Sequence, residues 1–427
     1  MDPEKRRLRI GITPLTDAAP IVVALELGFF ARQGLHVELS REPSWANIRD
    51  KLAAGALDAA HALAPMPIAA TLGLGPFQQP TVTALSLGLG GNAITVSTAL
   101  RRALDEADPV AAADPALCGR ALARVVGARR AAGAPPLRFA SVFPVSMHVY
   151  ELRYWLAAWD IAPERDVRLL VVPPPRMVAE LEAGRIDAFC VGEPWNSVAA
   201  QRSSGAILLT GHDVWSHAPE KVLAVSYDWA RRHRGTHRAL LRALLEAARW
   251  CDDPDHRREL AHRLSAGGYI DVPEDALTPA LIGRLGTGRA TSERVVPAFY
   301  TFHRFAASFP WRSHAAWIVT QMLLWGQIEK PVDVRAVAAA VYRSELHREA
   351  AEDLGLPCPA QDEKMEGAHA APWTLETTRA LIDMPPDRFL DGRVFDPFDI
   401  PGYLAGFSQR ELRVPLDELE AAQRQRE

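Results

Sequence analysis

Two segments of the chain, far apart in the sequence, repeat the same order of apolar and polar positions. The shared positions are Leu52, Gly55 and Asp58 in KLAAGALDAA, and Leu181, Gly184 and Asp187 in ELEAGRIDAF. In each copy the pattern predicts an amphipathic helix that ends at the glycine, which suits a left-handed C-terminal cap, followed by a short strand. Two such units predict two similar α/β lobes that face each other and enclose a small ligand.

Strand-like and helix-like segments alternate along most of the chain. The predicted strands are LRIGIT, LHVELSRE, DAAHALA and TVTALSLGL in the first lobe, and RFASVFP, VRLLVVP and IDAFCVG in the second. This alternation predicts an α/β fold with parallel or mostly parallel sheets. The strand-like KVLAVSYDWA then returns to the first lobe, and the C-terminal hundred residues are expected to wrap that lobe.

The return of the chain predicts a discontinuous first lobe. Residues 1–96 plus 210–427 form lobe 1 in this prediction, and residues 97–209 form lobe 2. The chain therefore crosses between the lobes twice. Two crossings make a hinge that suits closure around a ligand.

Composition and charge agree with a two-lobed globular protein. The chain has 427 residues, which is more than one hydrophobic core usually supports. Its residues are 48% apolar and 23% charged, and its net charge is −4, so its composition is not that of a disordered or a nucleic-acid-binding protein. The start, MDPEKRRLRIGI, lacks the apolar core of a secretory signal, and no later run predicts a membrane span, so we expect a cytoplasmic protein. The four cysteines, Cys118, Cys190, Cys251 and Cys358, lack metal-ligand spacing, which predicts reduced thiols.

Catalytic signatures are missing from the sequence. It contains no GxSxG elbow, no Walker loop, no HExxH, and no GxGxxG between a strand and a helix. The glycines of GLGLGGNAIT stand between two strand-like runs, so they favour close approach of the backbone to a ligand or to a crossing strand over a phosphate cradle. We therefore predict a binding protein without cofactor, metal or enzymatic activity. An enzyme acting on a small substrate in the same cleft stays open as a different class.

Several motifs resemble a known family in their order and approximate spacing. They are SWANIRDKL, LAPMP, GNAITVS, LRYWLAAWDI after His148, VGEPWN and HAPEKVLAVSYDWA. Together they resemble the nitrate- and bicarbonate-binding proteins of cyanobacterial-type ABC importers, over residues from about Leu8 to Tyr403. The resemblance implies the type II periplasmic-binding fold. Because an export signal is missing, the chain looks most similar to the cytoplasmic NasS-type nitrate and nitrite sensors, which work with a NasT-type (ANTAR) RNA-binding antiterminator.

The resemblance also implies an anion site made of Trp45, Asn92, His148 and Lys221, with the backbone of Gly91 nearby. A planar monoanion needs hydrogen-bond donors in its plane and a positive charge. The indole of Trp45 can only donate, and the amide of Asn92 and the imidazole of His148 can donate as well. The alternatives are a core aromatic for Trp45, a structural histidine for His148 and a solvated strand lysine for Lys221. Importers often have glutamine where this chain has Asn92, which leaves its direct contact open.

Lys221 decides between the ligands of this family. A charged side chain within an apolar strand needs a partner, and a lysine favours an anion that cannot give up a proton. Family members that bind bicarbonate have an acidic residue at a similar position, so Lys221 looks like the nitrate version. Glu193 in GEPWN would repel an anion, so we expect it to support the loop.

Thr13, Pro14 and Asp17, at the end of the first predicted strand, are further candidates for lining the cleft. The prediction is thus a nitrate or nitrite sensor that closes on its ligand and controls an antiterminator. The alternative is the solute-binding component of a nitrate ABC importer.

Overall fold

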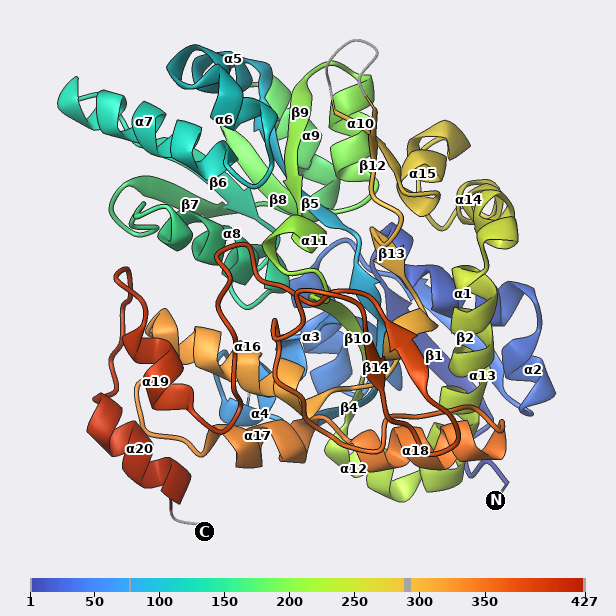
Figure 1. The fold of residues 1–427 in the computed structure, drawn as a ribbon. Coiled ribbons are helices and arrows are strands. Elements are labelled where there is room, and N and C mark those ends of the chain that lie inside the picture. Colours follow the sequence, from blue (N-terminus) through green and yellow to red (C-terminus); the bar gives the residue numbers. More distant parts are fainter. Residues whose placement is uncertain (1, 77, 288–292, 425–427) are drawn as a thin grey trace.

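The protein folds into two α/β lobes, seen in a computed structural model that describes residues 2–76, 78–287 and 293–424 (Figure 1). Each lobe is built on its own sheet, of six strands in the first and five in the second. The mixed α/β architecture confirms the predicted fold class.

The first sheet is mixed, whereas the sequence predicted a parallel or mostly parallel one. Its strands, in the order β13-β4-β10-β3-β1-β2, are β1 (Arg7–Ile12), β2 (His36–Arg41), β3 (Ala59–Leu63), β4 (Thr81–Gly90), β10 (Pro219–Ser226) and β13 (Tyr300–Thr301). β1 is parallel to β2 and β3, but β10 is antiparallel to both β3 and β4. The reason is that the chain returns from the second lobe at β10, which inserts between β3 and β4.

The second sheet begins earlier in the chain than predicted. Its strands, in the order β7-β6-β8-β5-β9, are β5 (Asn92–Ser97), β6 (Leu137–Ser141), β7 (Val167–Val171), β8 (Ala188–Gly192) and β9 (Gly205–Thr210). β5 pairs with β8 and β9 along its whole length, so the first crossing lies at Gly91 and not after residue 96. Gly91 makes this possible, because its φ of +87° lies in the left-handed region that favours glycine.

Helices cover both sheets. Around the first sheet they are α1 (Ala19–Glu26), α2 (Phe29–Arg32), α3 (Trp45–Ala53), α4 (Met66–Leu72), α12 (Tyr227–Arg232) and α13 (Arg234–Asp252). Between β5 and β10 they are α5 (Thr98–Ala107), α6 (Pro109–Ala113), α7 (Cys118–Ala131), α8 (Met147–Ala158), α9 (Met177–Glu182), α10 (Trp195–Gln201) and α11 (Gly211–Val214). Among the described residues, none of the helices has both the length and the apolar character needed to cross a membrane.

The chain after α13 adds helices and two short hairpins. The helices are α14 (Arg257–Ala266), α15 (Glu274–Leu281), α16 (Arg312–Leu324), α17 (Val334–Val341), α18 (Ser344–Asp353), α19 (Ile400–Ala405) and α20 (Leu416–Arg424), and the hairpin strands are β11 (Arg284–Gly286), β12 (Glu293–Val295), β14 (Trp373–Leu375) and β15 (Ile382–Met384). All four cysteines are free and buried in the structure.

The repeated sequence pattern plays the same part in both lobes. Gly55 and Gly184 have φ angles of +70° and +62°, which confirms the left-handed helix ends. Asp58 accepts a hydrogen bond from the backbone N–H of Arg9 on β1 at 3.0 Å, and Asp187 accepts one from the N–H of Arg138 on β6 at 2.8 Å. The aspartate thus ties each helix-strand unit to the neighbouring parallel strand, so the two lobes are built alike.

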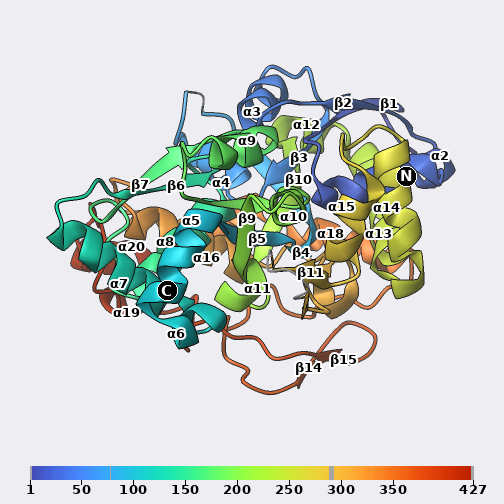
Figure 2. The same ribbon diagram turned by 90° about the horizontal axis from the view of Figure 1, so that it is seen from above.

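The C-terminal segment contacts both lobes, whereas the sequence predicted that it wraps the first. Figures 1 and 2 show this segment, in red, running from β14 and β15 to α19 and α20. Tyr154 of α8 donates to Asp391 Oδ1 at 2.8 Å, and Ser408 donates to Asp160 Oδ1 at 2.9 Å. The segment therefore connects the two lobes in addition to the two crossings.

The same segment is also bonded to the second crossing. Ser216 N donates to Arg388 O at 3.1 Å, and Leu390 N donates to Val214 O at 2.9 Å. The rings of Trp215 and Phe389 stack with centroids 4.8 Å apart. The C-terminal segment thus fixes the stretch of chain that leads into β10.

A buried ionic cluster anchors this contact. Lys364 Nζ pairs with Glu366 and lies 3.1 Å from Asp387 Oδ2. Asp387 also accepts hydrogen bonds from Trp215 Nε1 at 3.1 Å and from Gly367 N at 3.0 Å. Since Asp387 is fully buried, each of these donors depends on its carboxylate.

We predict that Asp387→Ala lowers the free energy of unfolding by about 3 kcal/mol, because it leaves buried donors and part of a buried charge without a partner. The exposed Asp383 of β15 offers a control, and Asp383→Ala should change stability by less than about 0.5 kcal/mol. Denaturant unfolding of both variants checks this. Equal effects of the two substitutions would show that the cluster does not anchor the segment.

Candidate functional site

A buried lysine occupies the centre of the predicted site. Lys221 of β10 is 1% exposed, and its Nζ lies 2.7 Å from Asp17 Oδ2 and pairs with Glu220. A buried ammonium group is tolerated only beside such counter-charges. The structure therefore excludes the alternative of a solvated strand lysine.

Glu220 and Lys221 reach the same cluster although they are neighbours in a strand. Successive residues of a regular strand point to opposite faces. The pairing of β10 with β4 shifts register on either side of Lys221, and such an irregularity re-aims side chains. This shift brings both charges together.

Asp17 and His61 support Lys221 from the first lobe. His61 Nε2 lies 2.9 Å from Asp17 Oδ1, and Thr13 N donates to His61 Nδ1 at 3.4 Å. This places the ring proton on Nε2, facing Asp17. Burial would raise the pKa of Asp17, but Lys221 and His61 outweigh it and hold that pKa well below its usual range, while burial lowers the pKa of His61. Asp17 is thus an anion and His61 a neutral donor.

The ring of Trp45 packs against this cluster. Trp45 is the first residue of α3, whose start is fixed by Ser44, which accepts from Asn47 N at 3.2 Å. Its ring centroid lies 5.5 Å from Lys221 Nζ and 5.3 Å from the ring of His61. The indole Nε1 is buried and has no hydrogen-bond partner among the described residues. A buried donor without an acceptor is costly, and a bound anion would satisfy it.

The remaining predicted donors converge on Glu220. Asn92 Nδ2 donates to Glu220 Oε2 at 2.8 Å, and His148 Nε2 lies 3.2 Å from Glu220 Oε1. Burial raises the pKa of Glu220 to about 7, against the lowering effect of Lys221, and burial followed by Lys221 lowers the pKa of His148. The planar carboxylate of Glu220 thus contacts the donors that were predicted to bind a planar anion.

Gly91 and Glu193 make contacts outside this cluster. A methyl group on Gly91 would lie 2.0 Å from the ring of Tyr300, whose hydroxyl donates to Gly91 O at 3.1 Å. The carboxylate of Glu193 accepts from Ser197 N at 3.1 Å, which confirms its supporting role in the loop. Burial raises the pKa of Glu193 to about 7.

Of the three residues proposed from the first strand, Asp17 joins the cluster and Thr13 is buried beside His61, while Pro14 is only partly buried. His61 and Glu220 were not among the residues predicted from the sequence. The sequence contains a feature that could have identified each of them: His61 interrupts the apolar strand AAHAL, and Glu220 is next to Lys221. In a regular strand Glu220 and Lys221 would point to opposite faces, and only the register shift brings both to the cluster.

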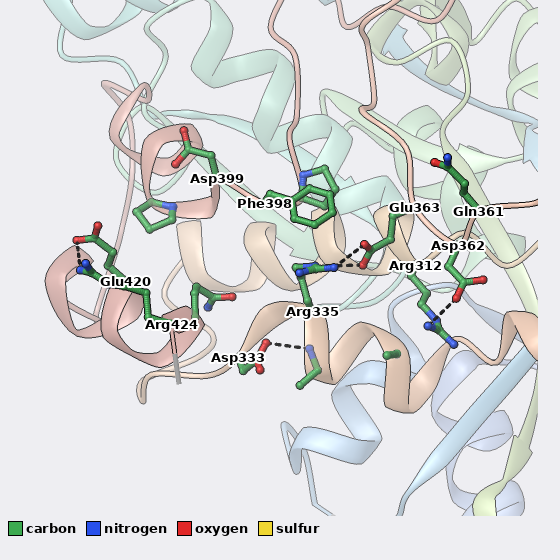
Figure 3. Close-up of a pocket in the computed structure, with 15 residues that line it drawn as sticks. Arg312, Asp333, Arg335, Gln361, Asp362, Glu363, Phe398, Asp399, Glu420 and Arg424 are labelled. Atoms are coloured by element: carbon green, nitrogen blue, oxygen red, sulfur yellow. Dashed lines mark hydrogen bonds and ion pairs between the residues drawn. The ribbon is translucent and has the colours of Figure 1, made fainter. Parts of the chain in front are cut away.

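A cavity of about 650 Å³ lies near α17, α19 and α20, away from the predicted site residues (Figure 3). Its arginines already have carboxylate partners: Arg312 pairs with Asp362, Arg335 with Glu363 and Arg424 with Glu420. The cluster around Lys221 differs in having a buried donor without a partner, Trp45 Nε1, whereas none of the described residues that line this cavity has one.

Comparisons with known proteins show the family of the chain. The NMT1-like family pattern matches residues 1–265. The chain is 37% identical over 414 residues to the nitrate import ATP-binding protein NrtC of Synechocystis sp., covering 96% of this chain and 57% of that protein, so it spans little more than half of that relative. It is 33% identical to the nitrate/nitrite binding protein NrtA of Synechococcus elongatus, covering 96% of this chain and 88% of that one.

A solved structure shows the same fold. The periplasmic nitrate-binding protein NrtA from Synechocystis PCC 6803 superposes with a TM-score of 0.82 at 29% identity, covering 96% of this chain and all of that one. This confirms the predicted periplasmic-binding-protein fold. The chain belongs to the NMT1-like family and, within it, to the group of nitrate- and bicarbonate-binding proteins that includes NrtA and CmpA.

Proposed function

We propose that this protein binds nitrate or nitrite between its lobes, as the solute-binding component of an importer-type system. The observation that carries the proposal is the convergence of Trp45, Asn92, His148 and Lys221 in one buried cluster. These side chains come from both lobes, so only a closed cleft assembles them. The site offers to a planar monoanion several hydrogen-bond donors and the ammonium group of Lys221, whose charge is shared with Asp17 and Glu220.

Binding then requires that the anion take the place of Glu220. Lys221 Nζ and Asn92 Nδ2 are engaged by the Glu220 carboxylate in the structure. An incoming anion competes for these donors, and it also gives the Trp45 N–H an acceptor. Because the ligand contacts both lobes only when they are closed, its differential affinity shifts the population toward the closed form.

Bicarbonate is the second candidate ligand, and Glu220 is the specific observation that favours it. The presence of Lys221 predicted a nitrate site, but the neighbouring Glu220 lies in the same cluster. An ionised Glu220 could accept the hydroxyl proton of bicarbonate, whereas nitrate has no proton to give. The ionisation state of Glu220 therefore determines whether the site favours bicarbonate or nitrate.

The relatives favour a transport role over the sensor role expected from the sequence. Regulation of a NasT-type antiterminator and a cytoplasmic location stay predictions. Association with such an RNA-binding protein, measured with and without nitrate, would test the sensor role, because thermodynamic linkage requires partner and ligand to affect each other's affinity equally.

Titration calorimetry of the ligand-free protein with nitrate, nitrite and bicarbonate tests the proposed function. We expect saturable binding of nitrate or nitrite at one site. Stronger binding of bicarbonate would select the second candidate, and no binding of any of the three would contradict the assignment of an anion site.

Trp45→Phe should weaken nitrate binding by about 1.5 to 3 kcal/mol, since it keeps most of the apolar ring but deletes a hydrogen bond to a charged group. The stability of the protein should change less than the affinity, because the indole N–H has no partner in the ligand-free site. Calorimetry and thermal unfolding of the same variant measure the two effects. A variant that loses stability yet binds nitrate normally would support a purely structural role for Trp45.

Nitrate affinity should rise as the pH falls through about 7. The pKa of Glu220 is raised to about 7, and nitrate binds best when Glu220 is protonated and releases Lys221. Above that pH, Glu220 must take up one proton when nitrate binds, so the affinity should fall about tenfold per pH unit. Glu220→Gln should bind nitrate with little pH dependence between pH 6 and 8, to within about twofold. A wild-type affinity that stays constant over this range would contradict competition by Glu220.

A further inference from the structure

Asn92 lies between two buried carboxyl groups, and only one of them belongs to the cluster described above. Its Nδ2 donates to Glu220, as shown, and its Oδ1 faces the other way. A methyl group on Gly211 would lie 1.9 Å from Asn92 Oδ1 and 2.9 Å from Glu151 Oε2. The amide oxygen of Asn92 and the carboxyl group of Glu151 therefore share the space beside the backbone of Gly211.

Glu151 lies one helical turn after His148 on α8, so both side chains point to the same face of the helix. It is 1% exposed. Both of its oxygens and Asn92 Oδ1 are buried acceptors without a donor among the described residues. Two acceptors that face each other repel, unless one of them carries a hydrogen.

The surroundings of Glu151 favour its neutral form. Burial is the main cause that raises the pKa of Glu151 well above its usual range, and the charge of Glu220 adds to it, against the lowering effects of Asn92 and Lys221. Cys190 of β8, whose own pKa is raised by burial and by Glu151, also lies nearby. Lys221 is already shared by Asp17 and Glu220, so it does not neutralise a third carboxylate.

We propose that Glu151 is a positioning residue of the anion site: as a carboxylic acid it donates its O–H to Asn92 Oδ1 and fixes the Asn92 amide with its NH₂ toward the anion. This inference rests on the proposed anion-binding function and deepens it. If the amide turned over, Asn92 Oδ1 would face the anion and repel it. Glu151 thus makes Asn92 a donor without touching the ligand.

A pair of substitutions tests the donated hydrogen bond. Glu151→Gln keeps a donor for Asn92 Oδ1 and should bind nitrate within about twofold of the wild type, whereas Glu151→Met has a similar length but no donor and should bind roughly tenfold more weakly. Glu106→Met on α5 replaces an exposed glutamate of the same lobe and should leave the affinity unchanged. Equal losses in the Gln and Met variants, or no loss in Glu151→Met, would overturn the proposal.

A double-mutant cycle separates positioning from general damage to the fold. If Glu151 acts through Asn92, then Glu151→Met should have no further effect on affinity in an Asn92→Ala background. A loss that persists in this background would show that Glu151 acts by another route, and would overturn the positioning role.

Infrared spectroscopy of the ligand-free protein tests the proton on Glu151 independently of binding. At alkaline pH, where Glu193 and Glu220 are ionised, the wild type should keep a carboxylic acid C=O band that Glu151→Gln lacks. Absence of this band in the wild type would overturn the proposal even if nitrate binds. Failure of the wild type to bind any of the three anions would instead contradict the proposed function, while the band still decides the state of Glu151.

Discussion

The structure depends on the burial of one ammonium group. Lys221 is closed off from water, and a charge in such a place requires counter-charges within contact distance. Asp17 from the first lobe and Glu220 from the same strand supply them. His61, Trp45 and Asn92 are then arranged around this ionic centre, so the chemistry of the cleft follows from how Lys221 is held.

The fold brings these groups together through the return of the chain to the first sheet. β10 inserts antiparallel between β3 and β4, and its irregular pairing places both Glu220 and Lys221 at the cluster. The C-terminal segment is bonded to the stretch just before β10 and also to α8 of the second lobe. The C-terminal segment therefore connects α8 of the second lobe with the stretch of chain that leads to Glu220 and Lys221.

Much of the fold was predictable from the sequence because local patterns determine it. The repeated glycine and aspartate positions, Gly55 with Asp58 and Gly184 with Asp187, are explained by helix ends and by bonds to neighbouring strands that the two lobes share. The direction of β10 was not predictable, because it is set by where the chain comes back and not by its own residues. The same holds for the C-terminal segment, whose contacts with the second lobe join residues far apart in the sequence.

The site residues inferred from the family resemblance do converge, but their partners could not be predicted. Glu220 was missed because side chains alternate along a regular strand, and the register shift beside Lys221 is a property of the sheet. Glu151 was missed although it lies one turn after His148, because the role proposed for it depends on its proximity to the amide of Asn92, which belongs to β5. In both cases the role of the residue depends on contacts between segments that are far apart in the sequence.

A crystal structure of the protein with nitrate tests the central claim most directly. The account predicts that the anion lies within hydrogen-bonding distance of Lys221 Nζ and Trp45 Nε1, and that Glu220 no longer pairs with Lys221. Nitrate bound elsewhere, with Lys221 still paired to both Asp17 and Glu220, would contradict it.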